Sequence, residues 1–147
     1  VNEAAGEGGD RVFTTVDFIL GAGQEIETLR AVSPKGLVLF GNELDNRVQG
    51  GQGDDTVGGG QGNDQLIGGA GADNFAFGPN WGIDTIRDFE DGIDLIDMSK
   101  TGLAGFVALT VTQAGNNTRV TDGADVIILI GQSAGDITAD DFAFDLG

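Results

Sequence analysis

The sequence contains no cysteine and no histidine. Without cysteine it has no disulfide, no thiolate nucleophile and no cysteine-ligated zinc site. Without histidine it has no Ser-His-Asp triad, no HExxH zinc site and no histidine general base. Small extracellular folds usually need a staple. The 24 Asp and Glu residues leave hard cations, bound through oxygen, as the remaining kind of staple.

Positive charge is also scarce. Seven Lys and Arg stand against 24 Asp and Glu, so the net charge is −17. A chain this acidic is not expected to bind nucleic acid by neutralising phosphates, or to lie on an anionic membrane through a basic face. The longest apolar run, residues 126–130, is too short to span a bilayer. We therefore expect neither nucleic acid nor membrane insertion.

Glycine, in contrast, supplies 27 of the 147 residues, and proline only 2. The apolar share of 39% is ordinary, which favours a folded domain with a modest core over disorder. Residues 1–20 do not have the basic start and apolar run of a signal peptide. Because the chain opens in the middle of a repeat pattern, we expect it to be a piece of a longer protein.

Blocks of nine residues repeat in register along the chain. Three consecutive copies, GGQGDDTVG, GGQGNDQLI and GGAGADNFA, begin at Gly50, Gly59 and Gly68. A weaker copy, GNELDNRVQ, precedes them from Gly41, and an outlying copy, AGEGGDRVF, keeps the same phase from Ala5. The sixth positions are Asp10, Asn46, Asp55, Asp64 and Asp73, and the large apolar eighth positions are Val12, Val48, Val57, Leu66 and Phe75.

These blocks resemble the repeat of the RTX family, GGxGxDxUx, in which U is a large aliphatic residue. Residues 71–100 are similar to the segment that follows the repeats in serralysin-type C-terminal domains and in the R-modules of secreted mannuronan epimerases. The ending, ITADDFAFDLG, resembles their acidic-aromatic tail. The resemblance implies an all-β fold, namely a right-handed parallel β-roll (a β-solenoid) with calcium ions between stacked loops.

The length of the repeat indicates how the loops pair. Six turn residues and three strand residues make half a coil, so each loop stacks on the loop 18 residues later. Strands of three residues span about 10 Å and need stacked neighbours to be stable. An ion midway between loops about 4.8 Å apart can reach oxygens of both. This pairing predicts that Asp55 meets Asp73 and that Asn46 meets Asp64.

Several calcium ions are predicted from these loops. The sixth-position side chains supply charge and an oxygen, and the resemblance implies that carbonyl oxygens of loop glycines complete each shell. Asp45 can substitute for Asn46, since Leu44 replaces a glycine in that weak copy. Asp84 or Asp88 can pair with Asp64 in a further site, and Asp10 can face Glu27 in a terminal one. The glycines are Gly51, Gly53, Gly60, Gly62, Gly69 and Gly71.

Outside the repeats the pattern changes. Alternation over residues 12–20 predicts a half-buried strand. Residues 106–111, 118–121 and 126–130 are predicted as strands of an antiparallel cap that covers the open edge of the roll. A short helical turn is expected after Thr138, whose hydroxyl can cap it.

The whole chain, 1–147, is interpreted as one module. Residues 1–40 would form degenerate N-terminal coils, residues 41–77 the nonapeptide repeats, and residues 78–147 the cap and a secretion-signal region. The resemblance implies export by the type I secretion apparatus with an uncleaved C-terminal signal. The absence of Lys and Arg after Arg119 fits such a tail.

The charge then has a functional interpretation. Stacked carboxylates repel one another without calcium, so binding free energy becomes folding free energy. Calcium is abundant outside the cell, where modules bind it at roughly 10⁻⁴–10⁻³ M. We predict a non-catalytic, calcium-binding C-terminal module of a secreted bacterial protein. It would fold in the extracellular medium and support an upstream catalytic or adhesive domain.

Two other functions stay open. Polysaccharide binding, as in epimerase R-modules, would need an exposed basic stripe, and the few basic residues look scattered in the sequence. Trp81 and its neighbouring phenylalanines could form a glycan platform, although a core at the base of the cap explains them better. Adhesion or ice binding is disfavoured because no threonine ladder repeats. Asp94 and Asp97 fit turns or metal ligation better than a glycosidase pair.

Overall fold

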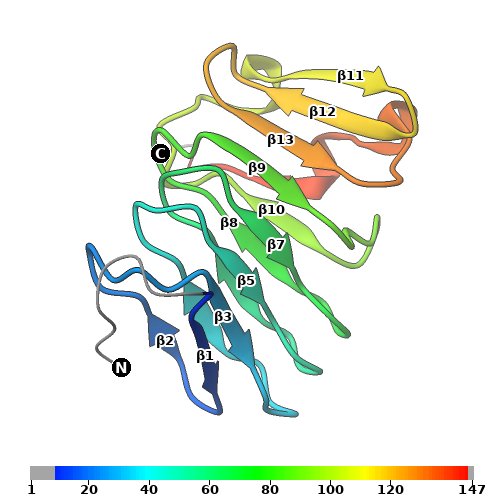
Figure 1. Ribbon diagram of the computed structural model, residues 1–147. Helices are drawn as coiled ribbons and strands as arrows, with labels where there is room; N and C mark the ends of the chain where they lie inside the picture. The colour runs from blue at the N-terminus through cyan, green and yellow to red at the C-terminus, as the bar shows by residue number, and fades with distance from the viewer. Residues whose placement is uncertain (1–8, 146–147) are drawn as a thin grey trace.

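The computed structural model describes residues 9–145 and is an all-β solenoid of about five turns, with only 7% helix. Two sheets lie face to face, and the chain passes from one to the other at each half coil (Figure 1). This confirms the predicted parallel β-roll. The predicted repeat glycines Gly6 and Gly8, and the last two residues of the tail, lie outside the described residues.

Both sheets are built largely from very short parallel strands. One sheet has eight strands, in the order β1 (Arg11–Thr14), β3 (Thr28–Ala31), β5 (Arg47–Gln49), β7 (Gln65–Ile67), β9 (Ile83–Ile86), β13 (Val126–Leu129), β12 (Asn117–Thr121) and β11 (Thr110–Ala114). The other has six, in the order β14 (Phe142–Ala143), β10 (Leu95–Asp97), β8 (Asn74–Ala76), β6 (Thr56–Gly58), β4 (Val38–Phe40) and β2 (Phe18–Ile19). We call them the eight-stranded and the six-stranded sheet.

The core lies between the two sheets and is made by the eighth position of each repeat. In a three-residue strand only the central side chain points inward, so each coil contributes one large apolar residue per sheet. The stack in the eight-stranded sheet is Val12, Leu29, Val48, Leu66 and Ile86, and that in the six-stranded sheet is Leu39, Val57, Phe75 and Ile96. All but Val12 are fully buried, which stabilises the roll by about 1.5–3 kcal/mol per side chain.

The spacing of 18 residues holds only inside the clear repeats. Arg47 pairs with Gln65, and Thr56 pairs with Asn74. The first coil is one residue shorter, because Arg11 pairs with Thr28, and the next is one residue longer, because Thr28 pairs with Arg47. The two deviations cancel, which explains why the outlying copy keeps the phase of the repeats.

The N-terminal strand prediction is wrong in its extent. Residues 12–20 form two strands in different sheets, β1 and β2. The Thr14 hydroxyl accepts a hydrogen bond from the Val16 amide at 3.1 Å and donates to the Val16 carbonyl at 2.8 Å, which turns the chain. Alternating residues continued across this turn and mimicked one strand.

The predicted antiparallel cap is confirmed, with one correction. β11, β12 and β13 are antiparallel, and β13 continues the eight-stranded sheet by pairing in parallel with β9 (Figure 1). The predicted strand at 106–111 is instead a 3₁₀ turn, η1 (Phe106–Ala108), followed by β11. The turn brings the Phe106 ring to 5.2 Å from that of Phe142, while Val107 points into solvent.

Below the cap, the aromatic residues form core and not a surface platform. Phe75, Phe77, Trp81 and Phe89 are all buried. The indole N–H of Trp81 donates to the Val126 carbonyl at 3.1 Å, so even its polar atom has a partner inside the fold. Trp81 is therefore unavailable for the glycan contact considered from the sequence.

Two further 3₁₀ turns, η2 (Ala134–Asp136) and η3 (Ala139–Asp141), lie near the C-terminus. Thr138 caps η3 as predicted, since its side chain accepts from the Asp140 amide at 3.3 Å. Within residues 9–145, no helix is long and apolar enough to cross a membrane.

Candidate metal centre

The sixth-position carboxylates form a column along each edge of the roll. In one column the Asp73 Oδ1 accepts from the Asp55 amide at 2.9 Å, and the Asp94 Oδ1 accepts from the Asp73 amide at 2.9 Å. The Asp55 Oδ1 extends this column by accepting from the Leu37 amide at 2.7 Å. Each carboxylate thus reaches across one full coil to the loop stacked before it.

The second column lies on the opposite edge. Here the Asp64 Oδ1 accepts from the Asn46 amide at 2.8 Å, and the Asp84 Oδ1 accepts from the Asp64 amide at 2.9 Å. The predicted contacts of Asp55 with Asp73 and of Asn46 with Asp64 are therefore present. Of the two residues considered as partners of Asp64, Asp84 is the one in contact.

Asp88 has a different position from the one considered in the sequence. Its two carboxylate oxygens accept from the amides of Gly68 and Gly69, at 2.9 and 2.8 Å. It therefore lies at the start of the loop that contains Asp73, and in the opposite column from Asp64.

The terminal pair is also brought together. The Glu27 Oε2 accepts from the Asp10 amide at 2.5 Å, and the Asp10 carbonyl accepts from the amides of Glu27 and Thr28, both at 3.1 Å. The Asp10 side chain itself makes no contact with Glu27 that would identify it as a ligand. Its role in a terminal metal site stays a prediction.

Three carboxylate oxygens in these columns have no hydrogen-bond partner. They are the Oδ2 atoms of Asp64, Asp73 and Asp84, and all three are buried. A buried, unpaired carboxylate oxygen is costly unless a cation compensates it. These oxygens therefore fit calcium, which takes carboxylate and carbonyl ligands.

Side chains alone do not complete a metal shell. Across the described residues, no group of three or more Asp and Glu side chains converges on one point. The remaining ligands must be backbone carbonyls, and the stacked loops bring these close. A Cβ atom added to Gly69 would lie 2.2 Å from the Gly51 carbonyl oxygen, and one added to Gly60 would lie 2.6 Å from that of Asn42.

The loop glycines meet this requirement in two ways. Gly60, Gly62, Gly69 and Gly71 have φ between 84° and 110°, which favours glycine. Gly51 and Gly53 are not in this conformation, which corrects the expectation that every loop glycine needs positive φ. They are still required by close packing, as a Cβ on Gly53 would lie 2.1 Å from the Gly36 nitrogen.

The fifth position of the repeat contributes a second ladder that the sequence analysis missed. The Asp45 Oδ1 accepts from the Asn63 amide at 2.8 Å, and the Asp54 Oδ1 accepts from the Ala72 amide at 2.8 Å. The Asn63 Oδ1 accepts in turn from the Ile83 amide at 3.0 Å. The Asp and Asn residues at consecutive fifth positions were the available signal. Asp45 is thus a loop brace, and the structure does not show it replacing Asn46.

Burial strongly perturbs the column carboxylates. It raises the pKa of Asp64 and of Asp73 from 3.8 to about 7, and that of Asp84 to about 8. Neighbouring carboxylates raise these pKa values further, and the hydrogen bond from the stacked amide opposes the effect. Near neutral pH a proton therefore competes with any cation for these oxygens.

This perturbation predicts an unusual pH dependence in chelator. Because the folded-state pKa values lie above the unfolded value of 3.8, the protonated carboxyls favour the fold. This stability is fully present below about pH 4 and is lost as the pH rises through 7 to 8. The midpoint of urea unfolding in chelator should therefore be higher at pH 5 than at pH 8, and Asp73→Asn should reduce the difference. The same midpoint at both pH values would contradict the burial argument.

The arginines are not scattered, contrary to the interpretation of the sequence. Arg11, Arg30, Arg47 and Arg119 lie on the outward face of the eight-stranded sheet, and Arg87 directly follows β9 in the same sheet. They are separated by up to 108 residues in the chain, and only the stacking of coils brings them together.

Comparisons with known proteins agree with this geometry. Residues 40–75 match the model of the RTX calcium-binding nonapeptide repeat (4 copies). The fold is similar to the solution structure of the AlgE6R2 subunit from the Azotobacter vinelandii mannuronan C5-epimerase. The TM-score is 0.61 at 25% identity, over 96% of this chain and 95% of that one. The AlgE6R3 subunit of the same epimerase gives a TM-score of 0.47 at 27% identity, over 76% and 80%. A search of curated protein sequences gives no match.

Proposed function

Because residues 40–75 are RTX calcium-binding nonapeptide repeats in a parallel β-roll, we propose that the chain is a calcium-dependent folding module of a secreted bacterial protein. Calcium would lie between stacked loops, bound by sixth-position carboxylates and loop carbonyls. The observation that carries this proposal is the set of three buried, unpaired carboxylate oxygens on Asp64, Asp73 and Asp84.

The acidic composition supports secretion as the setting. A net charge of −17 opposes compaction until cations neutralise it. In the cytosol, where calcium is scarce, the chain would stay unfolded and could pass through the channel of a type I secretion apparatus. Outside the cell, where calcium modules bind at roughly 10⁻⁴–10⁻³ M, it would fold and support an upstream catalytic or adhesive domain.

We propose no catalytic activity for the module itself. The sequence has no histidine or cysteine for acid-base or nucleophilic chemistry. Asp94, which was considered as a catalytic carboxylate, accepts from the amides of Asp73 and Glu90. Asp97 accepts from the Ser99 amide at 2.9 Å. These bonds support turn-forming roles for both residues.

Calcium binding is tested by calorimetric titration of the chelator-treated chain. We expect more than one ion per chain and much weaker binding of magnesium, which needs near-ideal octahedral geometry. Asp73→Ala should lower calcium affinity at least about tenfold, because it removes a buried carboxylate between two complete loops. Asp10→Ala, in the first coil, should have a smaller effect.

The pair of variants separates this proposal from a general charge effect, since each removes one negative charge. Equal losses of affinity would contradict the pairing of loops as the basis of the site. Tight magnesium binding by the wild-type chain would contradict a calcium-selective oxygen shell.

Polysaccharide binding is a second candidate function, favoured by the arginines of the eight-stranded sheet. The structurally similar subunit belongs to an enzyme named for its action on mannuronan, a polyuronate. A face that contains arginine and no carboxylate offers the complementary charge. Adhesion or ice binding has no comparable support, because the outward positions of the repeat strands, such as Arg47, Thr56, Gln65 and Asn74, do not repeat threonine.

A further inference from the structure

The outward face of the eight-stranded sheet differs in charge from the rest of the molecule. Each strand places alternate residues outward, and the register aligns them in rows across the sheet. One row reads Arg11, Thr28, Arg47, Gln65, Thr85, Ile128, Arg119 and Thr112. Within the strands that form this sheet, no Asp or Glu points outward, although the chain has 24 of them.

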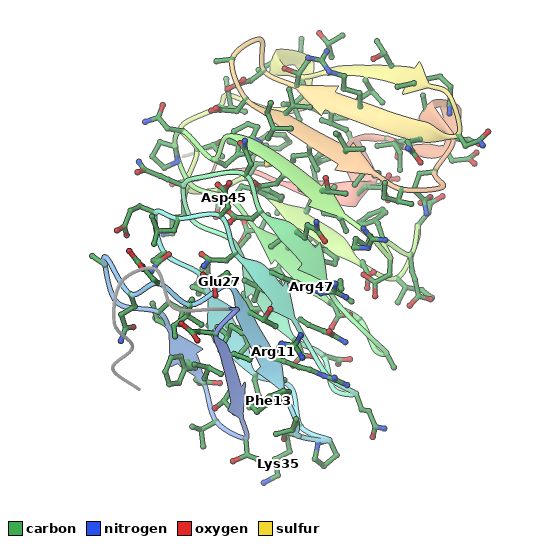
Figure 2. All side chains as sticks on the ribbon, in the orientation of Figure 1. Arg11, Phe13, Glu27, Lys35, Asp45 and Arg47 are labelled. Atoms are coloured by element: carbon green, nitrogen blue, oxygen red, sulfur yellow. The ribbon has the colours of Figure 1, made fainter. Side chains whose placement is uncertain are left out.

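Three of the arginines gather at the N-terminal coils. Arg11, Arg30 and Arg47 surround a shallow hollow of about 220 Å³, which Phe13, Thr28 and Gln49 also line. Figure 2 shows Arg11 and Phe13 on β1 near Arg47 on β5. Arg11 and Arg47 lie two strands apart, or roughly 10 Å at the usual strand spacing. Arg30 lies on β3 between them, one outward position further along the strand.

These guanidinium groups are available for a ligand. All three arginines are exposed, and none has an ion pair or hydrogen bond to another described residue. A guanidinium presents a planar fork of donors that matches a carboxylate in two hydrogen bonds. Phe13 is 56% exposed beside them and offers an apolar surface to the face of a sugar ring.

The hollow continues into a second one of about 370 Å³, with which it shares Arg30 and Gln49. The second hollow extends over Pro34 and the loop at Gly50 and Gly51. Such a shallow, extended and regularly spaced surface suits a linear polymer better than a small molecule, which needs a deeper pocket.

We propose that Arg11, Arg30, Arg47 and Phe13 bind the carboxylate groups and sugar rings of an acidic polysaccharide, and that this site forms only when calcium holds the first coils in register. The second part of this inference rests on the proposed calcium-dependent folding. The occupant is a carboxylated polysaccharide, because charge complementarity, bidentate arginines and an exposed ring are combined in one extended surface.

The coupling to calcium follows from the order of residues along the chain. Asp10, Glu27 and Asn46, which are predicted metal ligands, directly precede Arg11, Thr28 and Arg47. A neighbouring hollow lined by Glu27, Asn46 and Asp45 shares Thr28 and Arg47 with the arginine site. Ordering these loops therefore positions the arginines. Thermodynamic linkage then requires that the polysaccharide raise the apparent affinity for calcium.

The test measures binding of a short galacturonate oligosaccharide, which stays dissolved in calcium, by calorimetry and by amide chemical shifts. In calcium, the wild-type chain should bind it with shifts on β1, β3 and β5. The triple variant Arg11→Gln/Arg30→Gln/Arg47→Gln should bind at least about tenfold more weakly, since each bidentate pair is a strong contact. Arg47→Lys should also weaken binding, because it keeps the charge and loses the fork. Lys100→Gln, a matched charge change outside this sheet, should have no effect.

Coupling has a separate readout. The oligosaccharide should lower the calcium midpoint of folding, followed by circular dichroism, at least about fivefold in the wild-type chain and not in the triple variant. The triple variant also corrects for calcium bound by the sugar itself.

The outcomes distinguish the two proposals. If the chain folds on calcium and the triple variant binds the sugar as well as the wild type, the arginine site is wrong while calcium-dependent folding stands. If the chain is folded in chelator and still binds the sugar through the arginines, calcium control is wrong and the site stands. Equal or tighter binding of a heparin fragment or of single-stranded DNA would overturn the assignment to a carboxylated polysaccharide.

Discussion

Chelation of calcium should abolish most of the far-UV circular dichroism β signal of this chain at neutral pH, and millimolar calcium should restore it. The strands are two to five residues long and have no disulfide to hold them, so the fold depends on the stacking of coils. Without cations, that stacking confines the carboxylates of Asp64, Asp73 and Asp84 in columns where burial already opposes their ionisation. Calcium removes this penalty, so that its binding free energy becomes folding free energy.

The measurement is a titration of calcium into the chelator-treated chain at pH 7.5, with magnesium at the same concentration as the control. Magnesium should restore little of the signal, because it gives up its waters reluctantly. Sodium chloride at matched ionic strength controls for simple screening of the charge. A stable β signal in excess chelator, or full recovery with salt alone, would show that calcium is not the staple of this fold.

The repeats made the parallel roll predictable from the sequence. Their phase fixes which residue of each coil is buried and which loops stack, and the structure places Val48, Leu66 and Phe75 in the core accordingly. The contact of Asp55 with Asp73 follows from the same count. These predictions succeed because a nonapeptide with an apolar eighth residue has one consistent way to stack.

Outside the repeats, coil lengths vary and the count fails. Asp84 reaches Asp64 over 20 residues, and Asp94 reaches Asp73 over 21, because the loops between them contain extra residues. Local alternation also misled at residues 12–20, where a side-chain bond at Thr14 turns the chain between two sheets. Tertiary context decides both features, and a single sequence does not reveal it.

The arginine site was not predictable for a related reason. Arg11, Arg30 and Arg47 are 17 to 19 residues apart, and look isolated among acidic residues. Their common face depends on the irregular lengths of the first two coils, which place Arg11 and Arg47 in one row and Arg30 in the next. A one-residue change in either coil would turn one of these side chains to the opposite face.

Gly69→Ala should destabilise the calcium-loaded roll by about 3 kcal/mol or more, which lowers the thermal midpoint by roughly 10 °C. Gly69 has φ of 92°, which an L residue adopts only at a cost, and the new Cβ would lie 2.2 Å from the Gly51 carbonyl oxygen. Relief requires the two stacked loops to separate. That movement would strain the bond from the Ala70 amide to the Gly51 carbonyl, at 3.1 Å, and the bond from the Gly69 amide to Asp88, at 2.8 Å.

Gly78→Ala is the matched control, because a Cβ there meets no atom within 4 Å and needs no left-handed backbone. Its thermal midpoint should stay within the change expected of a surface substitution, about 0.5 kcal/mol. The separation of loops in Gly69→Ala should also weaken calcium binding, since carbonyl oxygens from both loops are needed where side chains do not converge. A Gly69→Ala variant with the midpoint and calcium affinity of Gly78→Ala would mean that the loops do not pack as closely as the stacked coils require, and that the ions do not lie between them.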